Sequence, residues 1–213
     1  MKHIPQIIPN VVEREAWLSR ALSEAEDYPA YRNRVSHLAE TGGTTGKDPD
    51  AARVGYTLLN HNRMKRWDKT LRLPAAVVDR LDGDIPPQTW LVLTESWCGD
   101  AAPILPVLNA MAEILPQVRL RIASRDEHPE LMDLFRTEGA LSIPKLIRVA
   151  DKGNRILGDW GPRPVPARQL VNDYKAEHGK LTAEFRETLQ QWYNRDKGQT
   201  VAYEIAAELL ADK

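Results

Sequence analysis

The chain has one cysteine, Cys98, and its position points directly to chemistry. Cys98 stands between an apolar run at residues 90–93 and a stretch from Ala101 with the pattern of a helix. A thiol at a strand-to-helix junction faces the first unpaired N–H groups of the helix, and these favour the thiolate. We therefore expect an exposed or half-exposed nucleophilic thiol. Two carboxylates, Glu95 and Asp100, oppose this effect, because nearby negative charge raises the pKa of a thiol.

No second thiol stands beside Cys98, because the position three residues later is Ala101. A single cysteine excludes an internal disulfide framework and a multi-cysteine zinc site. The five histidines fall on separate predicted elements without the spacing of metal ligands: His3, His37, His61, His128 and His178. The sequence therefore predicts one reactive group, with no metal and no other cofactor.

Two basic features are candidates for holding an anion. Residues 61–69 form a local basic patch with one aromatic side chain, Trp67. This patch either binds an anion, such as the carboxylate of a low-molecular-weight thiol, or is the solvated face of a helix, and the second interpretation is favoured. Arg163 either meets an anionic ligand near the cysteine loop or pairs with a surface acid.

The elements that must position Cys98 fall into three parts, of which the first, residues 1–87, is predicted to be helical. Asn10 is a plausible N-cap for the first helix. Further helices are predicted over about residues 29–39, 50–71 and 75–81, with a flexible loop at 41–49 and a turn at 82–87 that marks a boundary. The first nine residues lack the apolar segment of a signal peptide.

The second part, residues 88–165, alternates between strand and helix patterns. The predicted order is strand, helix, strand, helix, strand, strand, over residues 90–94, 101–115, 118–122, 129–136, 145–149 and 155–157. The first two links suit crossover connections, and the turn at 151–154 suits an antiparallel pair. This pattern predicts an α/β fold with a central mixed sheet flanked by helices.

The third part, residues 166–213, is predicted to be helical again. One helical pattern runs over about residues 166–194, with a possible break near Gly179, and an amphipathic helix follows over 201–210. An apolar helix face packs either on its own sheet or on another copy of the chain, so a homo-oligomer is a possible arrangement.

Composition excludes several classes of partner. The chain has 213 residues and a formal net charge of -1, which gives no electrostatic basis for binding nucleic acid or an anionic membrane surface. No apolar run is long enough to span a bilayer. The single cysteine and the missing signal segment point to the cytoplasm, where thiols stay reduced.

From about residue 89 to residue 160, several motifs together resemble the thioredoxin superfamily. The string Trp97-Cys98-Gly99 resembles the active-site loop, and Pro106 falls where that family has a proline in the active-site helix. The segment 124–129 resembles the strand end and proline before the next helix of the family, and Ser142-Ile143-Pro144 resembles its cis-proline segment. A further string, residues 158–164, resembles a bacterial thioredoxin-like subgroup with a helical N-terminal extension.

The resemblance implies a site and a division of the chain. It places Cys98 as the attacking cysteine, and it places the substrate against Trp97, Gly99, Asp100, Ile143 and Pro144. It implies that residues 88–165 are a thioredoxin-like core. Residues 1–87 are then a helical extension packed on that core, and residues 166–213 are C-terminal helices.

The departures from the family pattern are equally informative. Ala101 replaces the resolving cysteine. The buried aspartate of the family would fall at Val92, and the lysine that pairs with it would fall at Ile122. Loss of both charges leaves no uncompensated buried ion.

Two hypotheses for function follow from the resemblance. In the first, Cys98 carries out monothiol thiol-disulfide exchange with a protein disulfide or a low-molecular-weight thiol, and an external thiol resolves the product. In the second, the chain is a redox-inactive binding or interaction protein on a thioredoxin fold.

Overall fold

A four-stranded mixed sheet lies at the centre of the protein, seen in a computed structural model that describes residues 10–81, 85–152 and 155–211. The expectations for residues 1–9, 82–84 and 153–154 lie outside these ranges. The strands stand in the order β2-β1-β3-β4, with bounds β1 Gln88–Thr94, β2 Val118–Ser124, β3 Lys145–Ala150 and β4 Ile156–Trp160. Strand β1 is parallel to β2 and antiparallel to β3, and β4 is antiparallel to β3.

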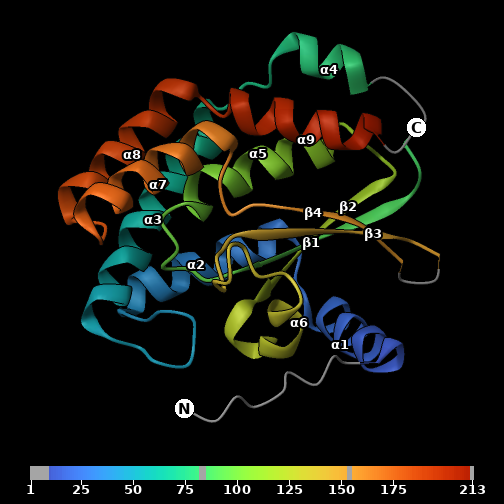
Figure 1. The fold of residues 1–213 in the computed structure, drawn as a ribbon, viewed down its shortest axis with the longest axis horizontal. Helices are drawn as coiled ribbons and strands as arrows, with labels where there is room; N and C mark the ends of the chain where they lie inside the picture. The colour runs from blue at the N-terminus through green and yellow to red at the C-terminus, as the bar shows by residue number, and fades with distance from the viewer. Residues whose placement is uncertain (1–9, 82–84, 153–154, 212–213) are drawn as a thin grey trace.

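Helices cover both faces of this sheet. Figure 1 shows α5 and α9 on one side, and α1 and α6 on the other. The helices are α1 Val11–Glu24, α2 Tyr28–Thr41, α3 Ala51–Thr70, α4 Ala75–Leu81, α5 Ala101–Glu113, α6 Pro129–Asp133, α7 Val165–His178, α8 Ala183–Asp196 and α9 Gln199–Ala211. A short 3₁₀ turn, Arg125–Glu127, precedes α6. The predicted α/β class and thioredoxin-like arrangement are confirmed.

Capping side chains explain where four of the described helices begin. Asn10 and Glu13 form a reciprocal capping box at the start of α1, which confirms the predicted cap. The side chains of Asp27, Asp50 and Thr182 accept backbone N–H bonds at the starts of α2, α3 and α8. Helices α5, α6 and α7 have no side-chain cap at their first turn.

The possible break near Gly179 is confirmed, because Gly179, with φ +75°, ends α7 and Thr182 caps a new helix. One helix prediction needs correction. The helix predicted over 129–136 ends at Asp133, and a short bridge between Thr137 and Ala140 follows.

The N-terminal helices are tied to the sheet by main-chain pairing. Glu26, between α1 and α2, donates to the carbonyl of Ile122 at 3.0 Å and accepts from its N–H at 2.8 Å. This bridge covers part of the free edge of β2, which would otherwise expose unpaired backbone groups.

The positions of the missing ion pair lie inside the core. Val92 and Ile122 stand opposite each other in the β1–β2 register, and both are buried. Apolar side chains therefore fill the place where the family has its charges. Among the described residues, no helix is both long and apolar enough to cross a bilayer.

Candidate active site

Cys98 lies in the turn that joins β1 to α5, but its thiol is not exposed. Its N–H donates to the carbonyl of Glu95 at 3.0 Å, which closes the turn. Its Sγ lies 3.3 Å from the carbonyl oxygen of Ile143 and donates a hydrogen bond to it. Only 6% of Cys98 is exposed, so the expectation of an exposed or half-exposed thiol was wrong.

Burial governs the charge state of this thiol. Desolvation, together with the nearby carboxylate of Asp100, raises the pKa of Cys98 to about 12. The backbone N–H groups of Ala101 and Asp100 and the charge of Arg163 act in the opposite direction. The helix start therefore has the predicted effect on the sulfur, but the cost of burying an anion exceeds it.

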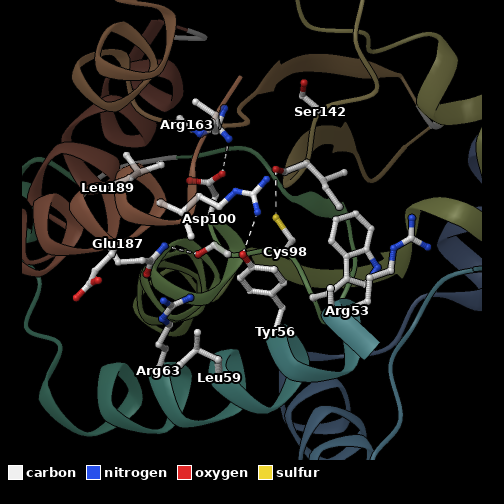
Figure 2. A pocket seen from close by; sticks show the side chains of 18 of the residues that line it. Arg53, Tyr56, Leu59, Arg63, Cys98, Asp100, Ser142, Arg163, Glu187 and Leu189 are labelled. Atoms are coloured by element: carbon white, nitrogen blue, oxygen red, sulfur yellow. Dashed lines mark hydrogen bonds and ion pairs between the residues drawn. The ribbon is translucent and has the colours of Figure 1, made fainter. Parts of the chain in front are cut away.

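Asp100 is held in a buried arrangement of its own. Arg163 forms an ion pair with it at 2.6 Å, and the hydroxyl of Tyr193 donates to it at 3.0 Å. Arg163 thus pairs with an acid, as one of the two sequence interpretations proposed, although this acid belongs to the cysteine loop. Figure 2 shows this pair beside the sulfur.

Helix α8 lies directly on the cysteine loop. Gln190 donates to the carbonyl of Gly99 at 2.8 Å, and Tyr193, one turn further along α8, bonds to Asp100. Helix α8 therefore occupies hydrogen-bonding groups of the cysteine loop.

Two loop residues before the cysteine serve the packing of the loop. The carboxylate of Glu95 accepts bonds from Ser124 Oγ at 2.7 Å and from the N–H of Asp126 at 2.9 Å. Ser96 joins the loop to α3, because Asn60 Nδ2 donates to its carbonyl at 2.9 Å and Thr57 Oγ1 lies 2.8 Å from its hydroxyl. Asp100 is the carboxylate with the largest effect in raising the pKa of the thiol.

A cavity of about 740 Å³ opens beside the sulfur. Five of the residues predicted for the site line it: Trp97, Cys98, Gly99, Asp100 and Ile143. Pro144 is buried and is not among the residues that line the cavity, and the Ile143–Pro144 bond is cis, as the resemblance implied. Figure 2 shows residues of α3 and residues of α8 around the same cavity as Cys98.

The helices outside the sheet supply cavity residues that the sequence did not indicate. Helix α3 contributes Arg53 and Tyr56, and α8 contributes Arg186 and Gln190. No motif connects these positions with Cys98. Only the approach of two sequence-distant helices brings them together.

The indole of Trp97 lies between two arginines. The guanidinium carbon of Arg53 is 5.0 Å from the ring centre, and that of Arg125 is 5.1 Å from it. Both distances are within cation–π range. Of the basic patch at 61–69, Arg63 lines the cavity and Trp67 packs in the core. No group of three metal-ligating side chains occurs within 10–81, 85–152 and 155–211.

The fold and the cysteine loop together define a thioredoxin-like protein. A family model, Thioredoxin_9, described as "Thioredoxin", matches residues 46–175, which is more than half of the chain. The chain belongs to this family. The matched range begins in the loop before α3, so it extends beyond the sheet and its central helix.

Two solved structures share the overall arrangement. A crystal structure of a protein of unknown function, PA1234 from Pseudomonas aeruginosa, is 17% identical, with a TM-score of 0.59 and coverage of 92% of this chain and 98% of that one. A crystal structure of an HIV epitope scaffold, 4E10_S0, is 21% identical, with a TM-score of 0.55 and coverage of 91% and 97%. At these identities the likeness shows the fold alone. No functionally curated protein matches the chain.

Proposed function

We propose that the chain carries out monothiol thiol-disulfide exchange through Cys98. The observation that carries this proposal is the placement of the sulfur, which lines a cavity and lies at the start of α5 beside the N–H groups of Asp100 and Ala101. A disulfide that enters the cavity comes within reach of the sulfur. Ala101 offers no second sulfur, so each cycle needs an external thiol.

The exchange balances in two steps. The Cys98 thiolate attacks one sulfur of a disulfide, the old S–S bond breaks, and a mixed disulfide with Cys98 forms. The departing sulfur leaves as a thiolate and takes up a proton from water. An external thiolate then attacks the substrate sulfur of the mixed disulfide, which frees Cys98 and leaves a new small disulfide.

A second candidate function is non-covalent binding in the same cavity, and the raised pKa of Cys98 favours it. With a pKa of about 12, only about one thiol in 10⁵ is ionised at pH 7. Exchange at neutral pH is then slow unless a bound substrate changes the surroundings of the sulfur. A binding protein needs no thiolate at all.

Alkylation against pH tests the two candidates. We expect iodoacetamide to label Cys98 in the folded chain, with a rate that rises up to the pKa of the thiol. Incubation with a small disulfide at pH 9 should add one mixed disulfide per chain, seen by mass spectrometry. The Cys98→Ser variant should gain neither label nor adduct. A native chain that labels only after denaturation contradicts exchange and leaves the binding function.

A further inference from the structure

The cavity beside Cys98 is lined by an excess of arginine. Five arginines face it, from four separate segments of the chain: Arg53, Arg63, Arg125, Arg163 and Arg186. Only three carboxylate residues line the same cavity: Asp50, Asp100 and Glu187. Guanidinium groups match the planar fork of a carboxylate, so such a lining suits an anionic small molecule.

Three of these arginines already have carboxylate neighbours. Arg163 pairs with Asp100, as described above. Arg125 pairs with Asp126 at 2.7 Å. The Nε of Arg53 lies 3.8 Å from the carboxylate of Asp50.

Arg63 and Arg186 form no ion pair among the residues that the structure describes. Arg63 is half-buried and donates to Asn60 Oδ1 at 3.1 Å, and a Cβ placed on Gly99 would lie 3.9 Å from its Nη1. It therefore stands beside the cysteine loop. Burial lowers the pKa of Arg63 and the charge of Arg66 acts in the same direction, while Tyr56 and Asp100 raise it.

Arg186 reaches the same cavity from α8. Its Nη1 donates to the hydroxyl of Tyr56 on α3 at 2.9 Å, and its guanidinium carbon lies 5.8 Å from the ring centre. This contact orients Arg186 without neutralising it. Two arginines without an ion pair thus line one cavity with the sulfur, Arg63 half-buried on α3 and Arg186 exposed on α8. Figure 2 shows Arg63 in this cavity.

The size and cover of the cavity favour a small molecule over a protein segment. Its volume of about 740 Å³ lies in the range of small-molecule sites. Helix α8 lies on the cysteine loop and bonds to Gly99 and Asp100. A protein chain approaching Cys98 from that side meets α8 first. Leu59 and Leu189 add apolar contact surface within the cavity.

We infer that the cavity binds a small dicarboxylate, with one carboxylate on Arg63 and the other on Arg186, and that its exchange substrates are small disulfides carrying such groups. The selection of these disulfides rests on the proposed exchange function. The binding of a dicarboxylate by Arg63 and Arg186 holds for a binding protein as well.

Three small disulfides of different charge test the inference on the full chain. They are 3,3′-dithiodipropionate, with two negative charges, bis(2-hydroxyethyl) disulfide, which is neutral, and cystamine, with two positive charges. At pH 8 and low salt, we expect Cys98 to form a mixed disulfide with the dianion at least about tenfold faster than with the neutral compound, and slowest with the dication. Salt at 0.5 M should reduce this preference.

Arginine variants show which side chains cause the preference for the dianionic disulfide. Arg63→Gln and Arg186→Gln should each reduce the ratio of dianion to neutral rate by about threefold to tenfold. Arg195→Gln is the matched control, because Arg195 is an exposed arginine on α8 that does not line the cavity. It should leave the ratio unchanged. Equal rates for all three disulfides overturn charge selection while exchange itself stands.

A redox-inert dicarboxylate tests the dicarboxylate site independently of thiol-disulfide exchange. Suberate has the length of 3,3′-dithiodipropionate with two methylenes in place of the two sulfurs. We expect calorimetry to detect suberate binding to wild type and to Arg195→Gln, and to find it weakened at least about fivefold in Arg63→Gln. Binding of suberate without any mixed disulfide supports the dicarboxylate site and overturns exchange. Absence of suberate binding overturns the dicarboxylate site.

Discussion

Two side chains of opposite charge act on the Cys98 sulfur from one side. Asp100 raises the pKa of the thiol and Arg163 lowers it, while desolvation is the largest effect of all. Because Asp100 and Arg163 are paired with each other, their effects at the sulfur partly cancel. The thiol is therefore kept neutral mainly by its lack of contact with water, and the carboxylate adds to that.

Replacement of Asp100 by Asn tests this arrangement. The variant removes a negative charge beside the sulfur and leaves the cation of Arg163 without its partner. Loss of the carboxylate and the unpaired cation both lower the pKa of Cys98. We expect iodoacetamide to label the folded Asp100→Asn chain roughly tenfold faster at pH 8. Because Arg163 loses its carboxylate, the free energy of unfolding should fall by about 3 kcal/mol.

The control for this variant is Glu187→Gln, which removes a carboxylate from the exposed wall of the same cavity. Solvent screens that charge, so the alkylation rate should stay within about twofold of wild type. An unchanged rate in Asp100→Asn would show that the carboxylate has no influence on the thiol.

At the scale of secondary structure, two groups of elements build the site. The sheet and α5 provide Cys98 and the carbonyl of Ile143, while α3 and α8 provide the cavity arginines. Ser96 joins the cysteine loop to α3, and Gln190 joins it to α8. Helices α3 and α8 therefore complete the cavity beside the sulfur.

Much of the first group, the sheet with the cysteine loop and α5, was predictable from the sequence. Short apolar and alternating runs fix strands locally, so β1 and β2 were found within two residues at each end. The loop at Cys98 and the cis bond at Pro144 follow from motifs that lie within a few residues. The predicted cap of α1 at Asn10 likewise depends on side chains at neighbouring positions.

The contribution of α3 and α8 to the cavity was not predictable, because it depends on contacts between residues that are far apart in the sequence. Tyr193 bonds to Asp100 across 93 positions of sequence, and Arg186 bonds to Tyr56 across 130. Helical periodicity identifies an apolar face, but it does not say which other element that face meets. For the same reason, the burial of Cys98 and its raised pKa could not be read from the loop.

The register of β1 and β2 allows a test of the missing ion pair. Val92→Asp places a carboxylate at a position that is 0% exposed, without a partner, and should destabilise the chain by about 3–5 kcal/mol. Ile122→Lys alone should cost a similar amount. Because the two positions are opposite in register, the double variant should lose less than the sum of the two, by about 1–3 kcal/mol.

Denaturant unfolding of wild type, the two single variants and the double variant gives this coupling energy. Val92→Asp combined with Arg80→Lys, a change on the exposed face of α4, is a control that should show no coupling. Strict additivity in the Val92–Ile122 pair would mean that the two side chains do not meet across the strands.

At the scale of the whole molecule, several buried acids are kept neutral. Burial raises the pKa of Cys98 and also that of Tyr28, Tyr31 and Tyr193. In the unfolded chain these groups return to their ordinary pKa values and lose protons at lower pH. The folded state then binds more protons than the unfolded state above about pH 9, so stability falls as pH rises.

Cys98 contributes a separable part of this alkaline loss. Its stabilising effect is fully present below the ordinary thiol pKa of about 9 and is lost as pH rises toward about 12. Between pH 9 and 10.5, wild type should lose up to about 1.4 kcal/mol per pH unit more than Cys98→Ala, which cannot titrate there. Urea unfolding of both chains across this range measures the difference. Parallel stability curves would mean that the folded thiol titrates as freely as an unfolded one.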